Sequence, residues 1–266
     1  MNRGPGWPDA GAPSSAAMRI SLGPVQVDAL TFSQALQAIE GLVGCGGSVF
    51  TPNVDHVVLA DEDAEFRAAY SAASLCLADG MPLVWAARLL GRPLPEKVSG
   101  SDLLMPLMEL AAVRGWRVYL LGGAPGAAEK AAEVFRARGV KVAGVDAPML
   151  RDPRSAAERA PILEKIGAAA PDLLLVAFGA PKQELFIHHS RRELGKAVAL
   201  GIGASLDFVA GHVRRAPRWM SEHGLEWLYR LLCEPRRLWR RYLLRDPKFA
   251  LIVWRELIGK RALLSP

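Results

Sequence analysis

The stretch SVFTPNVDHV, residues 48–57, decides the fold class of this chain. Residues 48–50 are mostly apolar and predict a strand, whereas the residues after Pro52 follow a helical pattern. Thr51 and Asn53 therefore lie at the carboxyl end of a strand, just before a helix. In a parallel α/β sheet this end is where ligands bind. The stretch thus predicts both a fold class and the edge of a binding site.

The alternation of strand and helix continues along the chain. Short apolar segments that end in turn residues recur at residues 74–78, 116–123, 172–179 and 196–203. Residues 18–27 predict a strand or a hairpin, and residues 54–73 predict one long helix. Short apolar strands that alternate with helices indicate an α/β fold with a parallel sheet covered on both faces.

Length and composition limit the organisation of the chain. It has 266 residues, of which 51% are hydrophobic, which is enough for one sizeable core or at most two modest ones. The three cysteines form no CxxC pair and are typical of small core residues in a reduced, cytosolic protein. We predict a disordered tail at residues 1–17, an α/β domain at residues 18–210 and a basic helical appendage at residues 211–266.

The appendage carries most of the positive charge. Residues 211–261 contain 13 Lys and Arg against 5 Asp and Glu, although the whole chain has a net charge of only +6. Pro235 and Pro247 divide the segment into short helices in which Trp, Tyr and Leu accompany the arginines. A helix packed on the core would explain part of this pattern, but a basic, Trp-rich amphipathic surface is typical of interfacial membrane binding. The sequence shows neither a nucleic-acid-binding motif nor an apolar stretch long enough to span a bilayer.

Four predicted strands end in residues that suit ligand binding. These ends are Thr51-Pro52-Asn53, Asp79-Gly80, the GGAPG turn at residues 122–126 and FGAPKQE at residues 178–184. Turn formation alone explains any one of them, and GGAPG lacks the spacing of a dinucleotide fingerprint or a Walker loop. FGAPKQE is more informative, because it places Lys182, Gln183 and Glu184 beside the free backbone N–H groups of a helix start. Such a start suits phosphate or sugar hydroxyls.

Two further features resemble metal sites but favour other roles. The DED sequence at residues 61–63 resembles an Asp-x-Asp motif, but positions i and i+2 of a helix point to different sides, which favours a solvated face. His188 and His189 have no carboxylate at ligand spacing in the sequence, which argues against zinc. We therefore predict no metal site and no cofactor.

Six stretches together resemble one known family. They are TPNVDHVVLA (51–60), LCLADGMPLVWAARLLGRPLPEKVSGSDLL (75–104), VYLLGGAPGAAEKAA (118–132), LLVAFGAPKQE (174–184), GIGASLDFVAGHVRRAPRWM (201–220) and GLEWLYRLLCEPRRLWRRYL (224–243). In this order they resemble the WecG/TagA/CpsF glycosyltransferases, glycosyltransferase family 26. The resemblance implies a Rossmann-like, mostly parallel sheet of the GT-E type, and an appendage that completes the active site at the membrane.

The resemblance also implies roles for individual residues. Asp79 matches the general base, and Thr51 and Asn53 match a polar pair that faces donor and acceptor. The candidate catalytic set is Asp79, Thr51, Asn53 and Arg237. The candidate substrate-binding residues are Lys97, Gly122, Gly123, Gln183, Asp207, Arg230 and Arg240. Lys97 stands where the family commonly has arginine, and lysine keeps the charge but loses the bidentate geometry.

The implied reaction is an inverting transfer of a hexosyl residue, with N-acetylmannosamine as the first choice. The donor would be a UDP-sugar, and the acceptor a polyprenyl-diphosphate-linked sugar used for surface polysaccharide or wall polymer synthesis. Such a transfer needs a carboxylate that accepts the acceptor's proton and positive charge for the departing diphosphate. Arginines of the appendage can supply this charge, so we expect a metal-independent enzyme.

Other interpretations stay open at this point. The donor could be UDP-glucose or a UDP-uronic acid, and the protein could be a non-catalytic membrane scaffold. A dehydrogenase is disfavoured because DALTF, rather than a GxGxxG loop, follows the first predicted strand. We expect a peripheral protein on the anionic, cytoplasmic face of the membrane, without a nucleic-acid partner, and a homo-oligomer is one further option.

Overall fold

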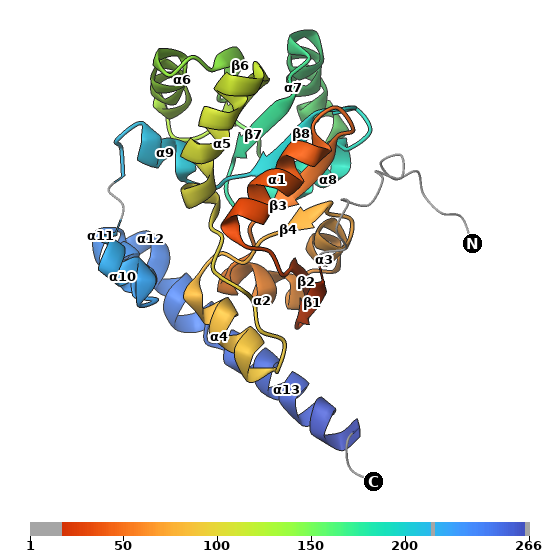
Figure 1. The fold of residues 1–266 in the computed structure, drawn as a ribbon, viewed down its shortest axis with the longest axis vertical. Helices are drawn as coiled ribbons and strands as arrows, with labels where there is room; N and C mark the ends of the chain where they lie inside the picture. The colour runs from red at the N-terminus through yellow and green to blue at the C-terminus, as the bar shows by residue number, and fades with distance from the viewer. Residues whose placement is uncertain (1–17, 214–215, 264–266) are drawn as a thin grey trace, which may run out of the picture.

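The computed structural model describes residues 18–213 and 216–263, apart from the side chains of Arg218, Glu222, Arg237 and residues 260–263. The predicted tail at residues 1–17 lies outside this range. The centre of the fold is a six-stranded sheet with the order β4-β3-β8-β7-β5-β6 (Figure 1). Its strands are β3 (Gly47–Phe50), β4 (Leu75–Cys76), β5 (Arg117–Gly122), β6 (Lys141–Asp146), β7 (Leu173–Ala177) and β8 (Val198–Gly201). Every pairing between them is parallel, which confirms the predicted sheet.

The sheet separates two apolar cores, because successive side chains of a strand point to opposite faces. In β7, Leu173 and Leu175 belong to one core, whereas Leu174 and Val176 belong to the other. One core is covered by α1 (Phe32–Leu42), α5 (Gly100–Arg114), α6 (Ala127–Ala137) and α9 (Ser205–Val209). The other is covered by α2 (Val54–Glu62), α3 (Ala64–Ser71), α4 (Met81–Leu89), α7 (Ala156–Ala169) and α8 (Lys182–Ser190). Helices on both faces confirm the predicted α/β class.

The first strands form a separate hairpin. β1 (Arg19–Leu22) and β2 (Val25–Asp28) pair in antiparallel fashion outside the main sheet. Asp28 links the two sheets, because its buried carboxylate accepts a hydrogen bond from the backbone N–H of Cys76 at 2.7 Å and pairs with Arg19 at 2.8 Å. The predicted strand or hairpin is therefore a hairpin.

The prediction of one long helix over residues 54–73 is wrong. α2 ends at Glu62 and α3 begins at Ala64, because Asp63 adopts extended backbone angles (φ −117°, ψ 112°). The Asp63 carboxylate accepts hydrogen bonds from the backbone N–H groups of Glu65 and Phe66. An aspartate that satisfies the free N–H groups of a new helix stabilises this break.

The basic C-terminal segment crosses the molecule below the carboxyl ends of the strands (Figure 1). It consists of α10 (Arg218–Glu222), α11 (Glu226–Cys233), α12 (Pro235–Arg240), a π-helical turn η1 (Arg241–Arg245) and α13 (Lys248–Leu263). Phe249 and Ile252 of α13 are buried, and Ile252 packs against the hairpin turn at Gly23. Pro235 begins α12 and Pro247 precedes α13, as predicted. None of the described helices is both long enough and apolar enough to cross a membrane.

Candidate active site

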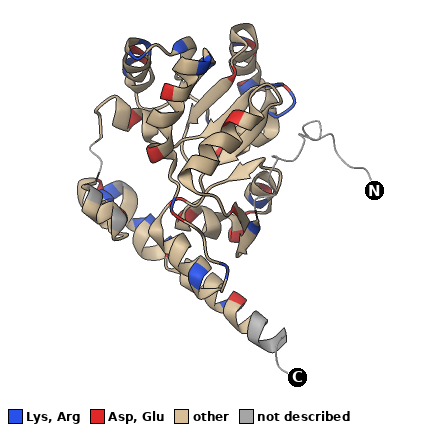
Figure 2. Ribbon diagram, in the orientation of Figure 1, with Lys and Arg blue, Asp and Glu red and all other residues tan. Residues whose placement is uncertain are grey.

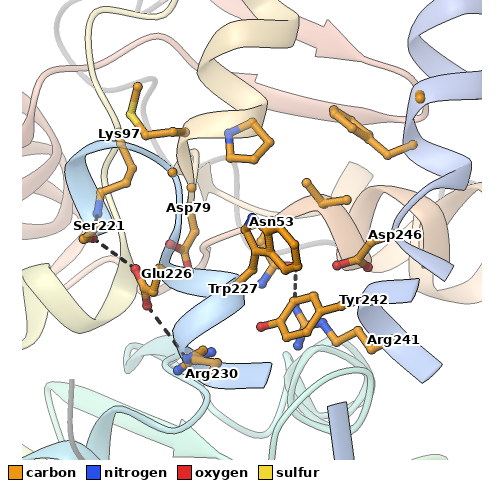
Figure 3. A pocket seen from close by; sticks show the side chains of 17 residues that line it. Asn53, Asp79, Lys97, Ser221, Glu226, Trp227, Arg230, Arg241, Tyr242 and Asp246 are labelled. Carbon is orange, nitrogen blue, oxygen red and sulfur yellow. Dashed lines mark hydrogen bonds and ion pairs between the residues drawn. The ribbon is translucent and has the colours of Figure 1, made fainter. Parts of the chain in front are cut away.

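Two cavities lie side by side between the sheet edge and the C-terminal segment. The larger has a volume of about 470 Å³ and the smaller about 310 Å³. The residues that line both, and so mark the junction of the two cavities, are Asn53, Asp79, Glu226, Arg230 and Arg241. Figure 3 shows the smaller cavity with these side chains around it. The predicted convergence of strand ends is therefore a two-chambered crevice.

The larger cavity collects most of the site residues predicted from the sequence. Those that line it are Thr51, Asn53, Asp79, Gly123, Gln183, Asp207 and Arg230. The first turn of α5 also contributes Gly100 and Ser101, so the N-terminus of a 15-residue helix faces this space. A helix N-terminus presents free N–H groups and a partial positive charge, which favour an anionic ligand.

Asn53 is held at the junction by the start of α2. It is the N-cap residue of that helix, and its side-chain oxygen accepts a hydrogen bond from the backbone N–H of His56. Arg241 donates a second hydrogen bond to the same oxygen at 3.1 Å. Because the carboxamide oxygen is already occupied, a ligand at this position meets the amide N–H donors. These donors suit sugar or phosphate oxygens.

Asp79 follows β4 at the junction of the two cavities, and Gly80 after it has a φ of 110°, a conformation that favours glycine. Burial raises the pKa of Asp79 to about 7, and the nearby carboxylate of Glu226 acts in the same direction. The positive charges of Lys97 and Arg230 oppose this shift. A carboxyl with a pKa close to neutrality can accept a proton and release it at physiological pH.

Lys97 lines the smaller cavity but is held by protein groups. Its ammonium group donates a hydrogen bond to Ser221 at 3.0 Å and pairs with Asp102 at 3.2 Å. The bond to Ser221 joins the α/β domain to α10. Lys97 therefore positions the C-terminal segment over the crevice as well as contributing positive charge to it.

Lysine and arginine residues occur along the described part of the C-terminal segment (Figure 2), and the contacts of the individual arginines differ. Arg230 lines both cavities, and its guanidinium lies 5.2 Å from the ring centroid of Phe208. Arg240 is exposed, and its guanidinium lies over the ring of Trp239, away from the lining of either cavity. The side chain of Arg237, a predicted catalytic residue, lies outside the described residues.

Arg241 is a site residue that our sequence reasoning missed. It lines both cavities, donates to Asn53, and forms an ion pair with buried Asp55 at 3.3 Å. Arg245 pairs with the same carboxylate at 3.0 Å. The signal in the sequence was Asp55 itself, because an aspartate in the apolar first turn after a buried strand needs a cationic partner.

Gln183 and Asp207 support the loops of the larger cavity. The Gln183 side-chain oxygen accepts the backbone N–H of Gly203 at 3.0 Å. Asp207 accepts a hydrogen bond from the backbone N–H of Ala124 at 2.9 Å and so joins the GGAPG turn to α9.

Gly123 lines the larger cavity. Gly122 ends β5, and a Cβ atom there would lie 2.9 Å from the Phe178 ring, so close packing is the reason for this glycine.

A cluster of buried polar side chains borders the larger cavity. His56 shares a hydrogen bond of 2.6 Å with the Tyr70 hydroxyl, and the Gln183 amide donates to Glu184 at 2.8 Å. Burial raises the pKa of Glu184 to about 7. Burial, reinforced by the charge of Arg241, lowers the pKa of His56 to about 3. His56 is thus a neutral lining residue at physiological pH, and neither it nor Tyr70 was singled out from the sequence.

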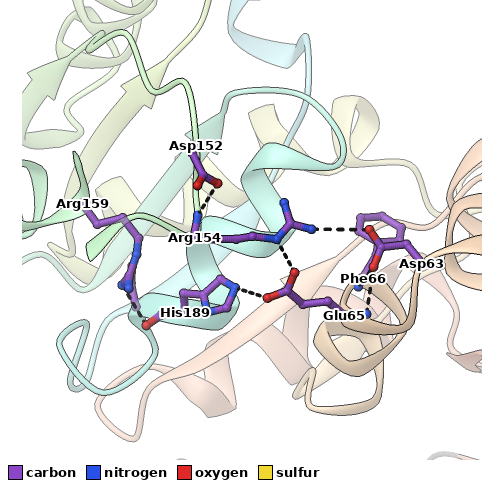
Figure 4. Close-up of polar contacts among 8 residues, drawn as sticks. Asp63, Glu65, Phe66, Asp152, Arg154, Arg159 and His189 are labelled. Carbon is purple, nitrogen blue, oxygen red and sulfur yellow. Dashed lines mark hydrogen bonds and ion pairs between the residues drawn. The ribbon is translucent and has the colours of Figure 1, made fainter. Parts of the chain in front are cut away.

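The DED residues are bound by cations of the protein. Asp61 pairs with Arg255 and Glu62 with Lys248, both in α13. Asp63 pairs with Arg154 in a surface cluster that also contains Glu65 and His189 (Figure 4). The fold therefore pairs His189 with a carboxylate that is distant in sequence, Glu65. Within the described ranges, no group of three His, Cys, Asp or Glu side chains is arranged to hold a metal ion.

A parallel α/β sheet, a polar crevice at its carboxyl edge and a basic helical cover are features of an α/β enzyme whose site suits an anionic ligand. The chain belongs to the glycosyl transferase WecG/TagA/CpsF family, whose model matches residues 20–263. A curated relative from Bacillus spizizenii (strain ATCC 23059 / NRRL B-14472 / W23) is 35% identical over 210 residues, which cover 78% of this chain and 79% of the relative. A second, from Bacillus subtilis (strain 168), is 33% identical over 220 residues, which cover 81% and 82%. Both relatives are named N-acetylglucosaminyldiphosphoundecaprenol N-acetyl-beta-D-mannosaminyltransferase.

Proposed function

We propose that this glycosyltransferase moves N-acetylmannosamine from its UDP conjugate to N-acetylglucosamine carried on undecaprenyl diphosphate. The names of the two relatives support the transferred sugar and the acceptor. The observation that carries the proposal is the pair of cavities that meet at Asp79. A transferase needs two substrate sites that share one reaction centre, and two cavities that meet at a carboxyl group provide this.

The chemistry of the two chambers favours one assignment of substrates. The UDP-sugar occupies the larger chamber, where the N-terminus of α5 and the polar strand ends receive its diphosphate. The acceptor occupies the smaller chamber, whose lining includes Trp227, Tyr242 and Phe249. Sugar and diphosphate groups of the acceptor then lie at the junction, close to Asp79.

In the proposed reaction, Asp79 acts as the general base. Its carboxylate takes the proton of the acceptor hydroxyl, the hydroxyl oxygen forms a bond to the anomeric carbon, and the bond from that carbon to the UDP oxygen breaks. Attack from the side opposite UDP inverts the anomeric centre. Thr51 and Asn53 hold sugar or phosphate oxygens during this step.

We assign the stabilisation of the leaving diphosphate to arginine. Arg230 and Arg241 line both chambers, so their charges lie at the junction where negative charge develops on UDP. Guanidinium groups bind phosphate oxygens in bidentate fashion. In this proposal, Arg237 keeps its predicted role at the diphosphate. Arg240 is exposed outside both cavities and adds to the attraction by an anionic membrane surface.

Exposed apolar side chains support association of the C-terminal segment with a membrane. In this segment they are Trp219, Trp227, Leu232, Trp239, Leu243, Leu244, Leu251, Trp254 and Ile258. Tryptophan and arginine together suit the headgroup region of an anionic leaflet. We propose that the protein binds the cytoplasmic face of the membrane through this surface. The alternative is that a second copy of the chain covers the exposed apolar side chains.

A panel of donors tests the proposal. The purified protein is incubated with UDP-N-acetylmannosamine, UDP-N-acetylglucosamine, UDP-glucose or a UDP-uronic acid and with a water-soluble N-acetylglucosamine diphosphate lipid analogue. Mass spectrometry of the products should show transfer of N-acetylmannosamine. Transfer of glucose or a uronic acid instead would replace the donor assignment. UDP binding without any transfer would favour the non-catalytic scaffold.

A further inference from the structure

The smaller cavity has a polar part and an apolar part, and the proposed reaction uses only the polar one. The residues shared with the larger cavity are polar or charged and include Asp79, Arg230 and Arg241. The apolar residues that line only the smaller cavity include Met81, Pro82, Trp227, Tyr242, Phe249 and Ala250, and Lys97, Ser221 and Asp246 line it as well. This apolar lining comes from α4, α11, η1 and α13, and a sugar diphosphate has no group that would fill it.

Two stripes of apolar side chains lead from this lining to the surface. On α4, Met81 lines the cavity, and Trp85 and Leu89 follow at intervals of four residues with 50% and 63% exposure. Residues at this spacing lie on one face of a helix. The Trp85 ring packs on the backbone at Gly224, which itself lines the cavity, so Trp85 stands at the rim.

The stripe on α13 has the same spacing. Ala250 lines the cavity, and Trp254 and Ile258 follow at intervals of four residues, with 59% and 45% exposure. Arg92, just beyond α4, forms an ion pair with Glu256 of α13 and so links the ends of the two helices. Each of the two linked helices therefore carries an apolar stripe that begins at the same cavity.

We propose that the apolar part of the smaller cavity binds the first isoprene units of the acceptor's prenyl chain, and that the stripes of α4 and α13 guide the rest of the chain to the membrane. This inference rests on the proposed function, because that function places the sugar and diphosphate groups of the acceptor at the junction of the two cavities. A molecule with a diphosphate head and a hydrocarbon tail matches a cavity that changes from cationic to apolar. A chamber of about 310 Å³ is too small for a whole undecaprenyl chain, so the chain must leave it.

The inference gives the α/β domain a part in lipid recognition. Sequence reasoning assigned membrane contact to the C-terminal segment alone, whereas Trp85 and Leu89 belong to α4. The enzyme would then distinguish prenyl diphosphate sugars from nucleotide sugars by the hydrocarbon next to the diphosphate, and not only by the sugar.

Binding of prenyl diphosphates without membranes tests the inference. Calorimetry on the full chain compares pyrophosphate, geranyl diphosphate and farnesyl diphosphate at concentrations at which they are monomeric. Affinity should rise with the length of the prenyl chain, because buried methylene groups favour binding. Farnesyl diphosphate should bind roughly tenfold or more tightly than pyrophosphate. Equal affinities of farnesyl diphosphate and pyrophosphate would overturn the inference.

A pair of tryptophan variants locates the binding. Ala250→Trp adds a large side chain to the cavity lining at an exposed helix position, and it should abolish the gain with chain length. Val113→Trp adds the same side chain at a position of 80% exposure on α5 and should keep the gain. If the affinity of Ala250→Trp still rises with prenyl chain length as in the wild type, the prenyl chain binds to the outer surface of the protein. The inference would then fail. A stable dimer in sedimentation that dissociates on binding would instead assign the stripes to a second copy and would also overturn the inference.

The outcome is separable from that of the proposed function. If sugar transfer occurs but chain length has no effect on binding, the prenyl site is wrong and the transferase assignment stands. If chain length increases affinity but no sugar is transferred from any UDP donor, the prenyl site stands and the proposed reaction fails.

Discussion

Asp79 is the residue on which the proposed chemistry depends. It lies where the two cavities meet, and burial together with the charge of Glu226 raises the pKa of its carboxyl to about 7. The strand tip and Gly80 fix its backbone, while Lys97 and Arg230 keep the carboxylate form accessible. A base with this pKa works in the neutral range without holding its proton permanently.

Replacement of this carboxylate tests its role. Asp79→Asn should lower kcat by roughly 10²–10⁴-fold, which is the usual contribution of a positioned proton acceptor. The affinity for UDP, measured by calorimetry, should change little, because asparagine has almost the same shape. In the wild-type enzyme, kcat/KM should fall as the pH drops below about 7, because Asp79 becomes protonated. Near-normal turnover in the variant would remove Asp79 from the reaction.

Glu184 affects stability, and its effect has a definite sign. Burial raises the folded-state pKa of Glu184 to about 7, above its ordinary value of 4.5. Between these values the folded state binds more protons than the unfolded state, so the free energy of unfolding falls as the pH rises through this window. The loss is on the order of 3 kcal/mol.

Glu184→Gln should remove this part of the pH dependence. Urea unfolding at pH 5 and pH 8.5 should show a smaller difference in the variant than in the wild type, because glutamine stays neutral and can still accept the hydrogen bond from Gln183. Glu129→Gln, at an exposed position of α6, is the matched control and should retain the wild-type difference. An unchanged difference in Glu184→Gln would mean that Glu184 is ionised in the folded state throughout.

Among the structural elements, the π-helical turn η1 decides which arginine reaches the crevice. Arg240 ends α12 and is exposed, whereas Arg241 begins η1 and contacts Asn53 and Asp55. The two residues are adjacent in sequence and identical in chemistry. They therefore form a matched pair in which only the position differs.

Arg241→Ala should lower turnover by roughly 100-fold, the scale expected for the loss of one charge-stabilising donor. Arg240→Ala should stay within about threefold in a membrane-free assay, because exposed charges contribute little to local energetics. Steady-state kinetics with a soluble acceptor measures both. Equal losses would show that position relative to the crevice does not matter, which contradicts the assignment of Arg241.

The arginines that α11 and η1 bring to the crevice lead to a prediction about metal ions. If Arg230 and Arg241 neutralise the departing diphosphate, transfer should continue in the presence of EDTA at nearly the untreated rate. The assay is repeated after chelation and again with added Mg²⁺ or Mn²⁺. Loss of activity that either ion restores would contradict the assignment to arginine.

The elements also show what the sequence could and could not predict. Hydrophobic periodicity placed the parallel strands and most helices, because burial on both faces of a sheet leaves continuous apolar segments such as residues 173–177. It did not show the break at Asp63, because a capping interaction depends on backbone angles that the pattern does not contain. It also did not show Arg241 or the pairing of His189 with Glu65, because these contacts join segments that are distant in sequence.

At the scale of the whole molecule, the C-terminal segment covers the crevice and also presents an outer apolar surface. Leu251 and Trp254 are exposed and three residues apart on α13. Leu251→Ser with Trp254→Ser should weaken binding to vesicles that contain anionic lipid, because both side chains lose apolar contact with the headgroup region. High salt should weaken binding of the wild type as well.

Cosedimentation with anionic and neutral vesicles measures both effects. Val113→Ser provides an exposed apolar control on α5 and should bind vesicles as the wild type does. If the double variant binds as strongly as the wild type, a membrane role for α13 is wrong. If it changes the sedimentation coefficient instead, the surface joins two copies of the chain.

The central claim is that two substrates meet at Asp79 and react in one inverting step. The most direct test is the anomeric configuration of the product that the wild-type protein forms from UDP-N-acetylmannosamine and a soluble N-acetylglucosamine diphosphate lipid, determined by NMR. The account predicts a β-linked N-acetylmannosaminyl product from the α-linked donor. An α-linked product would require a second displacement and a protein nucleophile, and it would contradict the single-base mechanism at Asp79.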